Sequence, residues 1–387
     1  MREIAVVTVG RSDWGIYLSL LRSIEAHPDL RLRLLVSGMH LSPEFGLTVR
    51  DIAAAGFEVF ERVESLLSSD TPTGIAQSVG VGVLGFAQVF SRYQPDILVL
   101  LGDRFDMLPA GLAALPFRIP IAHLYGGELT EGAMDDGIRH ALTKLSHLHF
   151  VAAEPYASRL RQMGEDDWRI VVSGALSLDA VRESKLMSAQ ELNEQFGVDA
   201  GSPFLLVTYH PVTLEVEETV AQVEHLLGAL DKQGMPCLFT YPNADTAWRS
   251  IVERIEAYCA AHPRSRLICN AGQRGYFSLM NVAAAMVGNS SSGLIEAPAF
   301  GLPVVNIGNR QRGRLHAANV LNCAAEREAI AVALDMVLSP EFRAGLRGLT
   351  NPYGDGHAAE RIVERLATVK LGRPLVGKRF ADRTMVV

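Results

Sequence analysis

The feature that most constrains the fold is an alternation of short apolar runs with longer segments of helical periodicity. Runs that stay apolar throughout are typical of strands covered on both faces in a parallel sheet. We expect helices at 16–26, 138–146, 157–163, 216–232, 247–262 and 326–338. A first series of strands is expected at 3–9, 31–38, 57–63, 96–102, 119–126, 148–153 and 169–174, and a second at 204–210, 236–242, 266–270, 283–288 and 303–308. This pattern predicts the α/β class, with two Rossmann-like doubly wound domains.

The length of the chain also favours two domains, because 387 residues exceed one ordinary hydrophobic core. A polar stretch at 185–199, followed by Gly-Ser-Pro at 201–203, interrupts the alternation between the two series. We therefore expect an N-terminal domain over 1–178 and a second domain over 179–365.

Composition excludes several classes of partner. The net charge of −7 gives no basic field for nucleic acid or an anionic membrane. No run approaches the roughly 18 apolar residues of a membrane span, and the first apolar run is too short for a signal peptide. The cysteines, Cys237, Cys259, Cys269 and Cys323, have no metal-binding spacing and are expected as free thiols. A cytoplasmic protein is the expectation, since free thiols suit a reducing compartment.

Polar side chains follow the predicted strands of the first series, where open parallel sheets bind ligands. They are Arg11, Asp103, Arg104, Glu128, Asp135, Asp136 and Arg139. Several carboxylates in one place suit general acid and base catalysis, because repulsion and burial separate their pKa values. Structural roles stay open: Asp135 and Asp136 precede a helix and could cap it, and Asp103 follows a turn glycine. Arg11 follows Gly10 in a turn that suits an anion or an ordinary solvated arginine.

In the second series, a histidine and three serines follow strands. His210 ends one predicted strand, and this position makes a catalytic role about as well supported as a structural one. Ser290, Ser291 and Ser292 lie where the strand at 283–288 turns into a predicted helix, which suits a diphosphate. Glu296 could then accept a hydrogen bond from a ribose hydroxyl. A plain serine cap is the alternative, although one serine would be enough for it.

Four motifs in order resemble those of the UDP-hydrolysing UDP-N-acetylglucosamine 2-epimerases, in the branch that serves nonulosonate and sialic acid pathways. They are GDRFD at 102–106, HLYGGELTEGAMDDGIRH at 123–140, GNSSSGLIEAPAFGLPVVNIGNRQRGR at 288–314 and NPYGDGHAAERI at 351–362. The resemblance covers nearly the whole chain. One departure is Tyr125, which stands where non-hydrolysing relatives carry an acid.

The resemblance implies a GT-B-like fold, with two domains facing a cleft and a C-terminal segment, 366–387, that returns to the first domain. It implies that UDP is held by the second domain, the diphosphate by the three serines and the ribose by Glu296. Arg11 would reach the phosphates. The segment around Arg274, Tyr276 and Phe277 resembles the uracil-contacting stretch of the family. Arg104, Arg139, Arg310 and Arg314 would line the sugar and phosphate pocket.

The same resemblance implies that Asp103, Glu128, Asp135, Asp136 and His210 carry the chemistry. The reaction would release UDP and a free manno sugar from UDP-N-acetylglucosamine or a 2,4-diacetamido-2,4,6-trideoxy analogue, as a step towards sialic or legionaminic acid. No metal and no cofactor are expected. The protein is expected to form a homodimer or a homotetramer. The sugar, a UDP or GDP carrier, and the order of the two proton transfers stay open. The alternatives are a GT-B glycosyltransferase and a non-catalytic sensor of nucleotide sugars.

Overall fold

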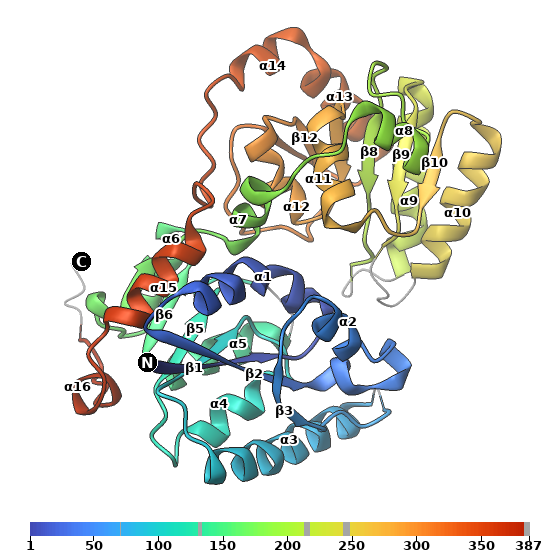
Figure 1. The fold of residues 1–387 in the computed structure, drawn as a ribbon. Coiled ribbons are helices and arrows are strands. Elements are labelled where there is room, and N and C mark those ends of the chain that lie inside the picture. The colour runs from blue at the N-terminus through green and yellow to red at the C-terminus, as the bar shows by residue number, and fades with distance from the viewer. Residues whose placement is uncertain (70, 131–133, 213–216, 243–247, 383–387) are drawn as a thin grey trace. The chain divides into compact units, whose positions relative to one another are not determined.

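The computed structural model describes residues 1–69, 71–130, 134–212, 217–242 and 248–382, and the chain forms two compact units (Figure 1). The first unit joins Met1–Ala180 to Tyr353–Val387, and the second is Val181–Pro352. The C-terminal part therefore rejoins the first unit at Tyr353, earlier than the expected position 366. The reason is a helix at Ala358–Thr368, which packs in the core of the first unit. The two-domain α/β prediction is confirmed.

The first unit is built on a seven-stranded parallel sheet with the order β3-β2-β1-β4-β5-β6-β7. The strands are β1 (Arg2–Thr8), β2 (Leu30–Ser37), β3 (Val59–Val63), β4 (Ile97–Leu101), β5 (Ile121–Leu124), β6 (Leu148–Val151) and β7 (Ile170–Val172). The helices are α1 (Arg11–Ala26), α2 (Val49–Ala54), α3 (Pro72–Arg92), α4 (Leu108–Ala114), α5 (Met134–Leu145), α6 (Glu154–Gln162), α7 (Leu176–Glu183), α15 (Ala358–Thr368) and α16 (Arg373–Val376). The strand order reverses between β1 and β4, where such sheets bind ligands.

The second unit has a six-stranded parallel sheet with the order β10-β9-β8-β11-β12-β13. The strands are β8 (Leu205–Thr208), β9 (Cys237–Thr240), β10 (Arg266–Ile268), β11 (Ala285–Gly288), β12 (Val304–Ile307) and β13 (Val320–Cys323). The helices are α8 (Ala189–Phe196), α9 (Thr219–Gln233), α10 (Trp248–Ala261), α11 (Gly272–Val282), α12 (Ser292–Ile295), α13 (Arg327–Leu338) and α14 (Pro340–Gly345), with a 3-10 turn at Ala297–Phe300. Here the order reverses between β8 and β11.

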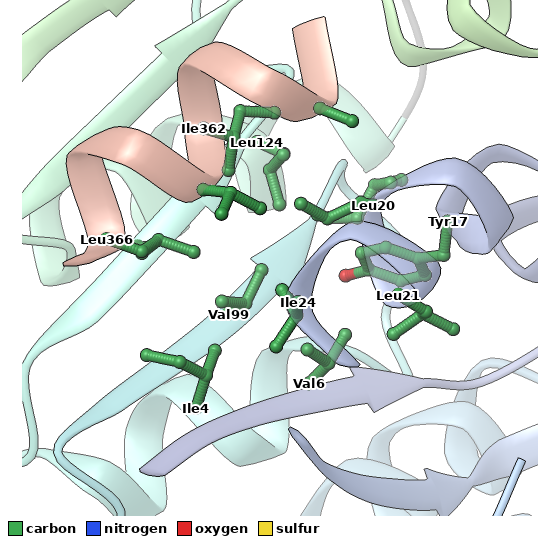
Figure 2. Packing of buried hydrophobic residues seen from close by; sticks show 14 of the residues in the cluster. Ile4, Val6, Tyr17, Leu20, Leu21, Ile24, Val99, Leu124, Ile362 and Leu366 are labelled. Atoms are coloured by element: carbon green, nitrogen blue, oxygen red, sulfur yellow. The ribbon is translucent and has the colours of Figure 1, made fainter. Parts of the chain in front are cut away.

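The returning helix α15 completes the core of the first unit. Ile362 and Leu366 of α15 lie against apolar side chains of β1 and α1, among them Ile4 and Leu20 (Figure 2). Asp179 of α7 is fully buried and accepts hydrogen bonds from the first two backbone N–H groups of α15, at 2.8 and 3.0 Å. A carboxylate in this position satisfies two of the unpaired donors at the helix start.

Beyond α15, the tail is fastened to the same unit by Lys378. Its Nζ donates to the carbonyl groups of Thr143, Lys144 and Ser146 at the end of α5, at 2.8–3.2 Å. It also forms an ion pair with Glu165 at 2.8 Å, and the Glu165 side chain is fully buried. Lys378 therefore caps the carboxyl end of α5, which lies more than two hundred residues earlier in the sequence.

Helix α3 was not predicted, and by length and composition alone it could cross a membrane. Of its most apolar 18-residue window, 33% is buried within the protein. Phe86, Val89 and Phe90 pack in the core, while Leu84 is 68% exposed and Val81 is 40% exposed. One such helix is weak evidence for a membrane span, since core helices pass the same test.

Candidate active site

Arg11 stands on a turn that a buried aspartate shapes. Helix α1 begins at Arg11 itself, earlier than the expected position 16, because Asp13 organises its first turn. The carboxylate of Asp13 accepts from Thr8 Oγ1 and from the backbone N–H groups of Val9 and Gly10, all at 2.8 Å. Burial raises the pKa of Asp13 to about 6. Arg11 is exposed at the start of α1, where a guanidinium and free backbone N–H groups suit an anion.

The carboxylates of the first unit are organised around the guanidinium of Arg139, which is almost fully buried. Its Nη1 donates to the carbonyl of Glu128 at 2.9 Å and to Asp136 Oδ1 at 3.3 Å. Its Nη2 donates to Thr130 Oγ1 at 2.8 Å and forms an ion pair with Asp103. One side chain thus joins the loop after β4, the loop after β5 and the start of α5, and it contacts the carboxylates of Asp103 and Asp136 and the backbone of Glu128.

Asp135 and Asp136 differ in their surroundings. Asp136 Oδ1 also accepts from the backbone N–H of Thr130 at 2.8 Å, and its Oδ2 lies 3.4 Å from His140 Nε2. These contacts favour a structural role for Asp136, which holds the loop before α5. The pKa of Asp135 is raised by burial and by the neighbouring charge of Asp103. Asp135 is therefore better suited to exchange a proton.

Arg104 is held by Asp106 of its own loop and by Met39, which follows β2. Its Nε donates to Asp106 Oδ1 at 3.1 Å, and Nη2 lies 3.1 Å from the Met39 sulfur. Gly38 permits this packing, because its φ is +58° and a Cβ there would lie 2.7 Å from Asp106 Oδ2. Arg104 is thereby oriented at the switch point of the sheet, which is a position for a ligand-binding cation.

The serines of the second unit lie beside a tyrosine and an acid. The Tyr276 hydroxyl is 3.3 Å from Thr208 Oγ1 and interacts with Ser290 and Ser292. Burial raises the pKa of Tyr276 to about 12, and the charge of nearby Glu296 contributes. Hydroxyl groups and a buried carboxylate are thus gathered at the carboxyl ends of β8 and β11.

The helix that follows the serines is shorter than the sequence suggests. Ser291 precedes α12, which ends at Ile295 and gives way to a 3-10 turn that includes Pro298. The proline has no N–H for a continuing helix. One turn carries only a weak dipole, so the hydroxyl groups have to supply more of any anion binding than we expected.

His210 and the serine loop are joined by Asn289. The side-chain amide of Asn289 accepts from His210 N at 2.7 Å and donates to His210 O at 2.8 Å. The backbone carbonyl of Asn289 accepts hydrogen bonds from Arg310 Nη1 at 3.1 Å and from Gln311 Nε2 at 2.9 Å. Burial, with the nearby charge of Arg310, lowers the pKa of His210 to about 3. His210 is therefore neutral at physiological pH. Arg314 Nη1 donates to Gln311 Oε1 at 3.2 Å.

Two predicted contact residues have other partners. Arg274 is exposed, and its guanidinium contacts the carbonyl of Lys185 at 2.6 Å and Glu191 at 2.9 Å. Phe277 is buried, with its ring centroid 6.2 Å from that of Phe300. The structure thus connects Tyr276 of this segment with the serines, and it shows packing and surface contacts for Arg274 and Phe277.

Several organising residues were missed by the sequence reasoning. Asn289 and Gln311 lie inside the motifs already singled out, so their position was a usable signal. Asp106 likewise ends the GDRFD motif, whereas Asp13 lies outside the motifs and carries no comparable signal, because its role depends on burial. Gly288 is explained by its φ of +137° and by a Cβ position only 1.9 Å from the Thr208 carbonyl oxygen.

Comparison with known proteins decides the family. A family model described as UDP-N-acetylglucosamine 2-epimerase matches residues 22–367. The chain belongs to this family. Among curated members, it is 37% identical to the GDP/UDP-N,N'-diacetylbacillosamine 2-epimerase (hydrolyzing) of Campylobacter jejuni, over 88% of this chain and 89% of that one. It is 35% identical to the UDP-N,N'-diacetylbacillosamine 2-epimerase (hydrolyzing) of Legionella pneumophila, over 98% and 99% of the two chains.

Solved structures of 2-epimerases share the fold. The UDP-GlcNAc 2-epimerase of Neisseria meningitidis bound to UDP-GlcNAc superposes with a TM-score of 0.80, at 18% identity, over 95% of this chain and 99% of that one. A 2-epimerase structure from Listeria monocytogenes gives a TM-score of 0.78 at 18% identity, over 94% and 95% of the two chains. The GT-B-like fold class is confirmed, and the chain is an enzyme of the 2-epimerase family.

Proposed function

We propose that this enzyme is a hydrolysing 2-epimerase that converts a UDP-linked 2-acetamido sugar and water to the free 2-epimeric sugar and UDP. The observation that carries the proposal is the cluster around Arg139. Arg139 holds Asp103 through its carboxylate and Glu128 through its backbone carbonyl, and the pKa of Asp135, at the start of α5, is raised by burial and by the charge of Asp103. Inversion at C2 needs one group to remove a proton and another to return it, so several carboxylates in one place meet the requirement.

For the substrate, we propose UDP-N,N'-diacetylbacillosamine first, which is a 2,4-diacetamido-2,4,6-trideoxy sugar nucleotide, and UDP-N-acetylglucosamine second. The support is that the two relatives at 37% and 35% identity are both named for the diacetamido sugar. A GDP carrier is part of one of these names and belongs in the same test. The free manno product would serve nonulosonic acid synthesis, of the legionaminic or sialic type.

The first chemical step in this proposal is an elimination. A carboxylate removes the C2 proton, the electron pair forms the C1–C2 double bond, and the C1–O bond to UDP breaks. Because the C2 proton is poorly acidic, departure of UDP has to drive the step, and preorganised positive groups stabilise the charge that develops on it. We assign this stabilisation to Arg11, Arg104, Arg310 and Arg314. Neutral His210 can donate a hydrogen bond to the leaving group.

The second step is hydration of the resulting 2-acetamidoglucal. Water adds its hydroxyl to C1 and gives its other proton to a carboxylate, and a carboxyl group gives C2 a proton on the face opposite to the one that lost it. We assign the returned proton to Asp135, because its raised pKa lets it hold a proton closer to neutral pH. Asp103 and Glu128 are the candidates for the first step, and Asp136 holds their loop in place.

UDP is assigned to the second unit. In this assignment Ser290, Ser291 and Ser292 hold the diphosphate, Glu296 holds the ribose, and the segment 274–277 with Tyr276 contacts the uracil. The contact between the Tyr276 hydroxyl and the serines supports this grouping.

The deciding experiment is a proton NMR time course in deuterated water with each UDP-sugar and no acceptor. The proposal expects UDP and the 2-epimeric sugar, with deuterium at C2. A glycosyltransferase or a sensor would leave the sugar nucleotide intact under these conditions. An intact sugar nucleotide would therefore contradict the proposal and favour one of these two alternatives. Feeding the chemically prepared glucal to the Asp103→Asn, Glu128→Gln and Asp135→Asn variants separates the steps, because a variant impaired only in elimination still hydrates it.

We further propose a homodimer or homotetramer in the cytoplasm. Free thiols at Cys237, Cys259, Cys269 and Cys323 agree with a reducing compartment. The support for self-association is the outer face of α3, where Leu84 and Val81 are exposed and no charged residue occurs before Arg92.

A further inference from the structure

The second unit contains a cavity of about 780 Å³ that shares a single residue with the proposed function. It lies at the carboxyl ends of β12 and β13, between α9 and the loop that follows β12. Its lining includes Asn306, Gln311, Arg312, His225 and His316. Of the residues assigned above to UDP or to the sugar, only Arg314 also reaches this cavity.

The base of the cavity holds a polar atom that a ligand could satisfy. Asn306 is 4% exposed, and its Nδ2 donates to Asn322 Oδ1 at 2.8 Å. Its Oδ1 is buried and has no hydrogen-bond partner among the residues that the structure describes. A buried amide oxygen without a partner is costly, so this position favours an occupant that presents an N–H or O–H group.

The rim carries both signs of charge, because Glu218 and Glu326 line the cavity together with Arg312 and Arg314. Arg312 is exposed on the loop, and Arg314 is half-buried beside Gln311. His225 Nδ1 lies 2.9 Å from the Ala325 carbonyl, so Nδ1 carries the proton and Nε2 can accept a hydrogen bond. Two guanidinium groups on one side of a cavity suit a phosphate, which they can bind through paired hydrogen bonds.

We propose that this cavity is a separate binding site for a small phosphorylated sugar that carries an acylamino group. The acylamino N–H would donate to Asn306 Oδ1, the sugar hydroxyls would meet the amide and imidazole groups, and the phosphate would lie at Arg312 and Arg314. The volume agrees with such a ligand, since small-molecule sites measure roughly 300–1,000 Å³. The assignment stands on the cavity alone and holds whether or not the chain is an epimerase.

A line of hydrogen bonds leads from this cavity to the proposed UDP loop. Arg314 donates to Gln311, Gln311 donates to the Asn289 carbonyl at 2.9 Å, and Asn289 holds the backbone of His210. A ligand that draws Arg314 away would alter this line. This second part rests on the proposed UDP site, and it predicts that the sugar phosphate and UDP change each other's affinity by the same factor.

The test is isothermal titration of the full chain, saturated with UDP, with three probes. N-acetylglucosamine 6-phosphate has both groups, glucose 6-phosphate lacks the acylamino group, and N-acetylglucosamine lacks the phosphate. We expect the first probe to bind roughly 10-fold or more tighter than either of the others, the size of one good hydrogen bond or charge contact. Arg312→Ala and His316→Ala should each weaken its binding, whereas Arg347→Ala, an exposed arginine elsewhere in this unit, should not.

Three results would overturn the proposal. They are no binding of any probe up to about 10 mM, equal binding of glucose 6-phosphate, or binding that Arg312→Ala and His316→Ala leave unchanged. Because the titration measures binding and needs no turnover, absence of epimerase activity would contradict the proposed function without affecting the test of this cavity. A titration of UDP with and without the probe then tests the coupling.

Discussion

At the scale of single residues, the pair Asp103 and Asp135 gives the sharpest prediction. The charge of Asp103 contributes to the raised pKa of Asp135, after burial. Asp103→Asn removes that negative charge, so the pKa of Asp135 should fall. Because Asp135 has to be protonated to return the proton, the high-pH limb of the profile of kcat/KM against pH should then move to lower pH, in addition to a loss of rate. Asp29→Asn, at an exposed aspartate of the same unit, should leave the limb in place. An unmoved limb in Asp103→Asn would show that another group sets it.

A second residue-scale prediction concerns Glu296, which is 8% exposed and lies near Tyr276. If it accepts hydrogen bonds from the ribose, Glu296→Gln should cost about 1.5–3 kcal/mol of UDP affinity, or roughly 10- to 150-fold in Kd. Titration calorimetry with UDP measures this directly. Glu253→Gln, on the exposed face of α10, is the matched control. Equal affinity in both variants would remove Glu296 from the nucleotide site.

These residues also show where sequence reasoning works and where it ends. Asp103, Glu128 and the serines were found because they follow buried strands, and strand ends can be read from apolar runs. That Arg139 joins the acids could not be read, because it depends on a guanidinium reaching three loops in space. The same holds for Asp136, whose partners favour a structural role over the catalytic one predicted beside Asp135.

At the scale of elements, the predicted strands were recovered more reliably than the helices. Central strands are apolar throughout, so their signal is strong. The edge strand β13 was missed because its four residues include two that are polar or small, Asn322 and Cys323. Helix α3 was missed because its glycines and small residues hide the helical period.

The C-terminal tail supports a prediction about elements. In Glu165, hydrogen bonds and charges from His149, Lys144 and Lys378 outweigh burial, and they hold its pKa near 2. Because of this lowered pKa, ionised Glu165 stabilises the folded state at pH values above the ordinary pKa of glutamate. The contribution is lost as the pH falls through about 2.

Lys378→Met removes one of these charges and the cap on α5. The free energy of unfolding at neutral pH should fall by about 1–3 kcal/mol, and acid unfolding should begin at higher pH because the pKa of Glu165 rises. Urea titrations at several pH values measure both effects. Lys370→Met, at an exposed lysine on the same return segment, should behave as the wild type. Identical curves for the two variants would contradict a stabilising role for the tail.

At the scale of the whole molecule, the prediction concerns self-association through α3. Leu84 is the most exposed apolar side chain on its outer face, so Leu84→Glu should place a charge in a dimer contact and yield a monomer. Light scattering after size exclusion measures the mass. Val332→Glu, at a 61% exposed valine on α13, should leave the assembly unchanged. A wild-type protein that is monomeric at roughly 100 μM, well above the Kd of a stable dimer, would reject the homodimer.

The division of the chain into units also sets an order of assembly. Val181–Pro352 is continuous, so it has all its residues before α15 is synthesised. Met1–Ala180 emerges first from the ribosome, yet its core stays open at Ile4 and Leu20 until Ile362 and Leu366 arrive. The half of the protein that is made first is thus the half that finishes folding last, reversing the usual order of synthesis. A nascent chain stalled anywhere before α15 would expose apolar surface, and the growing polypeptide would depend on chaperones for that interval.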